Sequence, residues 1–386
     1  MDFFPFSRKL SPSLGGARGG LSEQGYRAKN FLEIFSEATI ICLVILFLAS
    51  CSKDEPKEKE TEAYVPVPLV LEIPSLFEKN ILAPVIPINN PLTEEGVALG
   101  KKLFFDPILS VDNSISCADC HAPSNSFTDE DQFSDGVNGV LGNRNSMPLF
   151  NLAWNYDERF FWDGSALSLE EQVFHPVTDT EEMANTWSNA EAALEASPDY
   201  PDLFLKAFGE TKIDSVKVAK AIAQFERTLI SGNSKFDKYL AGEVELSPSE
   251  ENGIAVFMDE TRGDCFHCHG NPNNPLWTDN IFHNNGLDST FTDLGLGAVT
   301  GDPADNGKFK SPSLRNLAFT APYMHDGRFN TLEEVIDQYS EGLKPSATID
   351  PLMKKVAQGG VRITEKDKAD LKAFLLSLSD EEFVKN

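Results

Sequence analysis

The chain has little positive charge, few cysteines and no apolar run long enough to cross a bilayer. Only 33 of its 386 residues are lysine or arginine, against 60 aspartate or glutamate, which gives a formal net charge of −27. This charge argues against nucleic-acid binding and against adsorption to anionic lipid, because both require a basic surface. Hydrophobic residues make up 41% of the chain, which is enough for packed cores, and the length allows two domains of ordinary size.

An apolar run at residues 38–49 follows Arg27 and Lys29 and is too short to span a membrane, which takes about 20 residues. It is typical of a signal peptide, and Leu-Ala-Ser-Cys at 48–51 resembles the lipobox of bacterial lipoproteins. We predict a signal peptide at 1–51, with Cys51 as the lipidated mature N-terminus. The protein is then exported and anchored by lipid in the bacterial cell envelope, facing the periplasm. The alternative is a cleaved secretory signal in which Cys51 has no role.

The next segment, residues 52–75, begins with many lysines, glutamates and prolines. Such a composition buries little apolar surface, so we predict a disordered tether between the anchor and the folded protein.

Four further cysteines form two copies of a Cys-x-x-Cys-His motif, made of Cys117, Cys120, His121, Cys265, Cys268 and His269. In such a motif the thiols attach a porphyrin through thioether bonds, and the adjacent imidazole becomes an iron ligand. A zinc site or a redox dithiol is the alternative for a Cys-x-x-Cys pair. Neither needs a histidine directly after each pair. The motif therefore predicts two covalent haem c groups, with His121 and His269 as axial ligands.

Segments around the two motifs repeat in the same order. The matched blocks are 145–153 with 311–318, 162–164 with 325–327, and 169–173 with 332–335. A repeat of this size indicates duplication of a domain rather than a solenoid. We predict an all-α protein of two tandem cytochrome-c-like haem domains, residues 76–228 and 229–386, related by internal duplication.

Several helices are predicted from capping residues and apolar spacing. Thr93 and Ser247 are candidate N-caps upstream of the two motifs, each followed by acidic residues. Residues 216–229 and 364–378 have apolar side chains at helical spacing. Residues 136–145 and 270–274 are rich in glycine, asparagine or proline and are predicted to be loops.

Four further motifs lie around the haem sites: Leu-Phe-Phe-Asp at 103–106, Phe-Trp-Asp-Gly at 161–164, Glu182-Met183, and Tyr-Met-His-Asp-Gly at 323–327. With them, the chain from Asn90 onward resembles the bacterial di-haem cytochrome c peroxidases, including the MauG branch. The resemblance implies a cytochrome-c peroxidase that reduces hydrogen peroxide to water at the N-terminal haem. Electrons would enter through the C-terminal haem.

The resemblance also implies roles around the N-terminal haem. Trp162 would be the bridge between the haems, and Glu182 would transfer protons during cleavage of the peroxide bond as general base and then acid. Gln172 would hold the peroxide, and Pro176 would shape the pocket. Without the family, Glu182 would be a carboxylate at a helix N-terminus and Trp162 a core aromatic.

The chain departs from ordinary members of the family in two places. No histidine occurs between Ala122 and Phe174, where those members place a histidine that blocks the N-terminal haem. Tyr339 stands where they have a methionine ligand to the C-terminal haem, as in the MauG branch. We therefore expect the N-terminal haem to be open to peroxide. For the C-terminal haem we expect Tyr339 as the sixth ligand, with Met324 as the alternative.

A calcium ion between the domains is a further implication of the resemblance. Its ligands would be the Asn145 side chain and the carbonyls of Thr320 and Pro322. From its own sequence context, Asn145 would be a turn residue.

The expected partners are hydrogen peroxide and a small cytochrome c, a cupredoxin or another periplasmic electron donor. A basic donor would suit the acidic chain, and a homodimer is left open. Contact with the membrane is expected only through the lipid anchor. Two other functions remain as alternatives: a MauG-like oxidase acting on residues of a partner protein, and a non-catalytic di-haem electron carrier.

Overall fold

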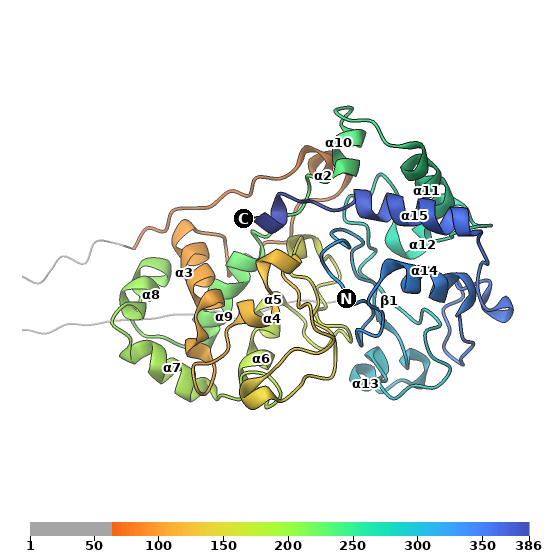
Figure 1. The fold of residues 1–386 in the computed structure, drawn as a ribbon. Helices are drawn as coiled ribbons and strands as arrows, with labels where there is room; N and C mark the ends of the chain where they lie inside the picture. The colour runs from red at the N-terminus through yellow and green to blue at the C-terminus, as the bar shows by residue number, and fades with distance from the viewer. Residues whose placement is uncertain (1–63, 386) are drawn as a thin grey trace, which may run out of the picture. The chain divides into compact units, whose positions relative to one another are not determined.

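Helices supply most of the regular structure in residues 64–385, the part of the chain that the computed structural model describes (Figure 1). The α-helices are α2 (Ser75–Asn80), α3 (Glu94–Phe105), α4 (Cys117–Cys120), α5 (Leu169–Gln172), α6 (Phe174–Thr178), α7 (Trp187–Ala196), α8 (Tyr200–Phe208), α9 (Ser215–Glu226), α10 (Lys235–Leu240), α11 (Pro248–Met258), α12 (Phe266–His269), α13 (Leu296–Thr300), α14 (Leu332–Glu341) and α15 (Glu365–Ser377). Short 3-10 helices lie at Pro107–Leu109, Pro123–Asn125, Val137–Gly139, Leu152–Trp154, Pro303–Asp305, Val356–Gln358 and Phe383–Lys385.

Within the same residues, one antiparallel pair joins β1 (Phe282–His283) to β2 (Phe309–Lys310). The all-α prediction therefore holds for the helices and misses this strand pair. The pair is too short for the alternation of apolar and polar residues that would reveal it in the sequence.

The predicted helix starts are confirmed where a side chain caps the first turn. Thr93 accepts a hydrogen bond from the amide of Gly96 at the start of α3, and Ser247 forms a capping box with Glu250 at the start of α11. Thr364 accepts a hydrogen bond from the amide of Asp367 at the start of α15. The helix predicted at 216–229 is α9, which ends at Glu226.

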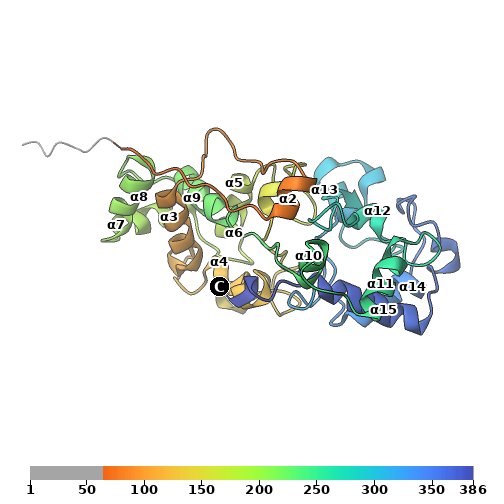
Figure 2. The ribbon, with the colours of Figure 1, turned by 90° about the horizontal axis from the view of Figure 1, so that it is seen from above.

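Two sets of helices each enclose a buried hydrophobic cluster. In the N-terminal set α3 packs against α8 and α9, and in the C-terminal set α11 packs against α15 (Figure 2). A glycine lies at each of these contacts. A Cβ on Gly100 would overlap the carbonyl oxygen of Ala221, and one on Gly253 would overlap that of Asp370. The absence of a side chain thus lets each helix pair approach closely.

The chain segments between the two sets are joined by a reciprocal pair of backbone hydrogen bonds. The amide of Asn145 donates to the carbonyl of His325 at 2.9 Å, and the amide of Lys310 donates to the carbonyl of Trp162, also at 2.9 Å. Residues 145 and 162 belong to one copy of the sequence repeat, and 325 and 310 belong to or adjoin the other. Each copy therefore contributes one donor and one acceptor.

This reciprocity supports our proposal of an internal duplication with a boundary near residue 228. The matched turns behave alike as well, since Phe161 and Met324 both have positive φ, at 66° and 75°. Each turn is closed by an isolated antiparallel β-bridge, between Phe160 and Ala166 in one and between Tyr323 and Phe329 in the other, and the two turns have the same length.

The signal peptide, Cys51 and residues 52–63 of the predicted tether lie outside the described residues. From Tyr64 onward the chain bonds to the N-terminal set of helices. The hydroxyl of Tyr64 donates to the carbonyl of Ala207, and the amide of Leu69 donates to the carbonyl of Leu92 at 3.0 Å. Disorder therefore stays a prediction for residues 52–63 alone. Between residues 64 and 385, no helix has the length and hydrophobicity that a membrane span requires.

Candidate active site

The first Cys-x-x-Cys-His motif forms a single helical turn with the histidine directly after it. Cys117 and Cys120 are the first and last residues of α4, and a capping box of Ser116 and Asp119 fixes its start. The Nδ1 of His121 donates to the carbonyl of Phe127 at 3.0 Å. This bond orients the ring and leaves Nε2 to coordinate iron. Burial lowers the pKa of His121, which favours the neutral form that a metal needs.

The second motif also forms a single helical turn, α12, but here Cys265 is the N-cap without a side-chain cap bond and His269 is the last helical residue. The Nδ1 of His269 lies 3.5 Å from the hydroxyl of Ser311, and that hydroxyl donates to the carbonyl of Cys268 at 3.3 Å. Burial, with a smaller contribution from His283, lowers the pKa of His269 to about 4. The four motif cysteines form no disulfide. Both motifs thus leave their thiols and one imidazole nitrogen available to a haem.

A cavity adjoins each motif. The first cavity, about 330 Å³ in volume, is lined by Cys120 and His121, and the second, about 220 Å³, is lined by Cys265, Cys268 and His269. The first volume is within the range of small-molecule sites, roughly 300–1,000 Å³. The free thiols and the oriented imidazoles of the two motifs fit two haem groups, one beside each cavity.

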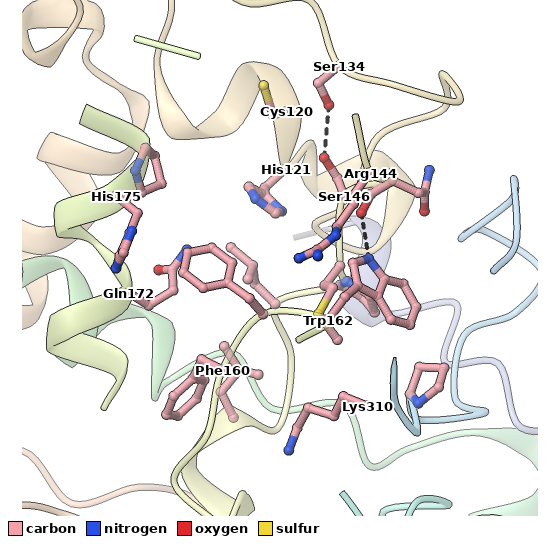
Figure 3. Close-up of a pocket in the computed structure, with 18 of the residues that line it drawn as sticks. Cys120, His121, Ser134, Arg144, Ser146, Phe160, Trp162, Gln172, His175 and Lys310 are labelled. Atoms are coloured by element: carbon pink, nitrogen blue, oxygen red, sulfur yellow. Dashed lines mark hydrogen bonds between the residues drawn. The ribbon is translucent and has the colours of Figure 1, made fainter. Parts of the chain in front are cut away.

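The predicted catalytic residues all line the first cavity. Gln172 is the last residue of α5, Pro176 lies in α6, and Glu182 follows in the next loop. Figure 3 shows Gln172 and His175 around the same pocket as His121. Burial, together with the nearby carboxylates of Asp179 and Glu181, raises the pKa of Glu182 to about 7. A carboxyl with this pKa exchanges protons readily near neutral pH.

Trp162 lines both cavities and is buried. Its indole Nε1 donates to the carbonyl of Asn145 at 2.7 Å (Figure 3), and its own carbonyl accepts from Lys310. Both bonds belong to the junction between the two repeat copies. The side chain is therefore fixed in the wall that the two candidate haem sites share.

Both candidate sixth ligands line the second cavity, and one side chain that the sequence did not single out contacts them both. The Nδ2 of Asn285 donates to the hydroxyl of Tyr339 at 3.1 Å and lies 3.7 Å from the sulfur of Met324. Burial raises the pKa of Tyr339 to about 12. The choice between Tyr339 and Met324 stays a prediction.

The proposed calcium ligands are brought together as well. Asn145, Thr320 and Pro322 line the second cavity. The Nδ2 of Asn145 donates to the carbonyls of Asp131 and Gln132, at 3.2 and 3.3 Å, which leaves its Oδ1 for a cation. The calcium site remains a proposal.

Two further charged residues lie near the haem sites, and the sequence did not point to the first of them, Lys310. Lys310 lines both cavities, and His283 is held between the carboxylates of Asp279 and Asp350 at 2.8 and 2.6 Å. Burial acts to lower the pKa of His283, but its hydrogen bonds to Asp279, Cys268 and Asp350 outweigh the burial and raise the pKa to about 11.

Residues 94–245 match the family model described as di-haem cytochrome c peroxidase. The chain is 40% identical to the methylamine utilization protein MauG of Methylorubrum extorquens over 301 residues, which cover 76% of this chain and 81% of that protein. It is 34% identical to the cytochrome-c peroxidase IdrP1 of Pseudomonas sp. (strain SCT) over 332 residues, or 77% of this chain and 84% of that one. A crystal structure of a MauG-like protein associated with microbial copper homeostasis superposes with a TM-score of 0.73 at 34% identity, covering 82% of this chain and 97% of the other.

Proposed function

Because the chain belongs to the di-haem cytochrome c peroxidase family, which includes MauG, we propose that it reduces hydrogen peroxide to water with electrons from an external donor. Family membership implies two c-type haems, in line with the two motifs. One observation carries the assignment of roles. Gln172, Pro176 and Glu182 line the cavity of His121, and that cavity shares Trp162 with the cavity of His269.

The haems, when bound, supply electron transfer and cleavage of the O–O bond. Glu182 accepts a proton from one peroxide oxygen and returns it to the departing oxygen, so that the oxygen leaves as water. Gln172 holds the peroxide through its amide. The overall reaction consumes two electrons and two protons for each peroxide and releases two waters.

The path of the electrons in this proposal runs from the cavity of His269 to that of His121. Trp162 is the aromatic side chain common to both, and its two hydrogen bonds hold it still. Tyr339 is the proposed sixth ligand of the second iron, with Met324 as the alternative.

Replacement of Glu182 by glutamine tests the assignment. Glutamine keeps the size but takes up no proton, so kcat/KM for peroxide should fall by about 10²–10⁴. Steady-state peroxide consumption with a reduced cytochrome or an artificial donor measures it. Glu195→Gln, which changes an exposed glutamate on α7, is the matched control. Unchanged turnover in Glu182→Gln would remove the acid–base role.

A second candidate function is a MauG-like oxidase that withdraws electrons from residues of a partner protein. Tyr339 in the second cavity and the absence of histidine between Ala122 and Phe174 favour it. A stable near-infrared charge-resonance band after addition of peroxide without donor would support this function. Rapid donor turnover without that band would support the peroxidase.

A plain electron carrier is the third candidate, and an EPR spectrum of the resting ferric protein separates it from the other two. An open first iron gives a high-spin signal, whereas a carrier with both irons six-coordinate gives none. For the cell, we propose export and lipid attachment at Cys51. The donor would be a small periplasmic cytochrome or cupredoxin, and a basic one would suit the net charge.

A further inference from the structure

Lys310 is a buried cation without an anionic partner. It lies on β2, only 6% of its surface is exposed, and Nζ donates to the carbonyl of Asn280 at 2.6 Å and to the Oδ1 of Asn155 at 3.3 Å. Both acceptors are uncharged. Among residues 64–385 no carboxylate forms an ion pair with this ammonium.

Such an environment is unfavourable for a positive charge. Buried charges in proteins are usually paired, because taking an ion out of water costs more than neutral hydrogen bonds return. Burial lowers the pKa of Lys310 to about 8, although Asp157 and Asp279 attract the charge from a distance. An ammonium has three N–H donors, and two are used here. The ring of Phe282 lies 5.2 Å from Nζ and attracts the charge, but no third hydrogen-bond acceptor is found among residues 64–385.

The position of Lys310 indicates where a third acceptor would lie. The residue lines both cavities, but Asn155 and Asn280, which bind its Nζ, line only the first. Its amide is bonded to the carbonyl of Trp162, which ties the strand to the wall between the cavities. The charged end of the side chain is therefore held at the cavity of His121.

Of the two residues that donate the reciprocal backbone bonds, Lys310 is charged and Asn145 is not. Asn145 occupies the equivalent place in those bonds. The segment of the C-terminal copy thus reaches across the junction and presents a cation to the first cavity.

We propose that the Nζ of Lys310 binds a propionate carboxylate of the haem in the first cavity. Haem carries propionate side chains, and a carboxylate is the anion that a buried ammonium with a free donor would recognise. Lys310 is then a positioning residue. It holds one edge of the haem and places a positive charge near the first iron. The inference rests on the proposed two-haem function.

Lys310→Met tests the proposal, because methionine is similar in length and uncharged. Loss of a positive charge favours the more oxidised iron, so the midpoint potential of the first haem should shift to lower values. A redox titration monitored by EPR separates the first haem from the second. Lys310→Arg, which keeps the charge, should lie closer to the wild type.

Lys308→Met is the matched control, since Lys308 lies two positions earlier and pairs with Asp305 at 2.8 Å. It should leave both potentials unchanged. Unchanged potentials in Lys310→Met, or a shift confined to the second haem, would overturn the proposal.

Haem content is measured on the same samples by the pyridine haemochrome method. Fewer than two haem c per wild-type chain would defeat the proposed function itself, whereas two haems with unchanged potentials would defeat only this inference. If Lys310→Met does not accumulate, Lys310→Arg decides by resonance Raman spectroscopy. The propionate bending band should move when a guanidinium replaces the ammonium, and an unmoved band would refute the contact.

Discussion

Peroxide reduction should lose activity below about pH 7, because Glu182 must be ionised to accept a proton. Burial is the main reason that its pKa is raised to about 7, and the carboxylates of Asp179 and Glu181 add to the effect. At pH 5, which is about two units lower, roughly 1% of the enzyme would carry the ionised carboxylate. Because about half of the enzyme carries the ionised carboxylate at pH 7, kcat/KM should fall about fiftyfold between pH 7 and pH 5.

The assay is a pH profile of kcat/KM, which reports on the free enzyme. Glu182→Gln should remove the acid limb together with most of the activity. Glu181→Gln should move the midpoint of the limb to lower pH, because it removes a negative charge that raises the pKa of Glu182. An acid limb that persists at the same pH in Glu182→Gln would show that another group controls it, and the reasoning would then fail.

Three other predictions concern buried groups. Burial raises the pKa of Glu226 to about 8, so its contribution to stability is present below about pH 4.5 and is lost as the pH rises toward 8. This loss amounts to about 3 kcal/mol at pH 7, and Glu226→Gln should remove it. Denaturant unfolding between pH 4.5 and 8 measures the free energy of unfolding, and an equal dependence on pH in the wild type and the variant would contradict the prediction. Arg315→Met should lower the free energy of unfolding by about 3–5 kcal/mol, because it leaves Asp237 buried without its two bonds of 2.7 and 2.8 Å; a loss below about 1 kcal/mol would contradict this. Asn285→Leu should lower the midpoint potential of the second haem, because Tyr339 without its donor is a stronger ligand to ferric iron; an unchanged potential would show that Tyr339 is not the ligand.

Local features were predictable from the sequence because they depend on neighbouring residues. The caps at Thr93, Ser247 and Thr364 rest on interactions within a few residues. The placement of Gln172, Pro176 and Glu182 in one cavity was expected from the family resemblance, not from their spacing alone. Their chemical roles remain proposals.

Features that depend on distant segments were not predictable. Lys310 stands two residues after Lys308, and in sequence both look like solvent-exposed lysines. Only the reciprocal bonding of the repeat copies turns Lys310 inward. Asn285 precedes a glycine in an ordinary turn sequence, and its contacts come from α14 and the 323–327 motif.

The reciprocal bonds at the junction are made entirely by main-chain atoms, between Asn145 and His325 and between Lys310 and Trp162. These two bonds depend on no particular side chain, although side-chain bonds between Arg144 and Asp293 and between Lys310 and Asn155 cross the same junction. The consequence concerns chimaeras that take one flank from each of two related enzymes. They should keep the two main-chain bonds whatever their side chains, but they lose the Arg144–Asp293 ion pair unless both of its partners are retained.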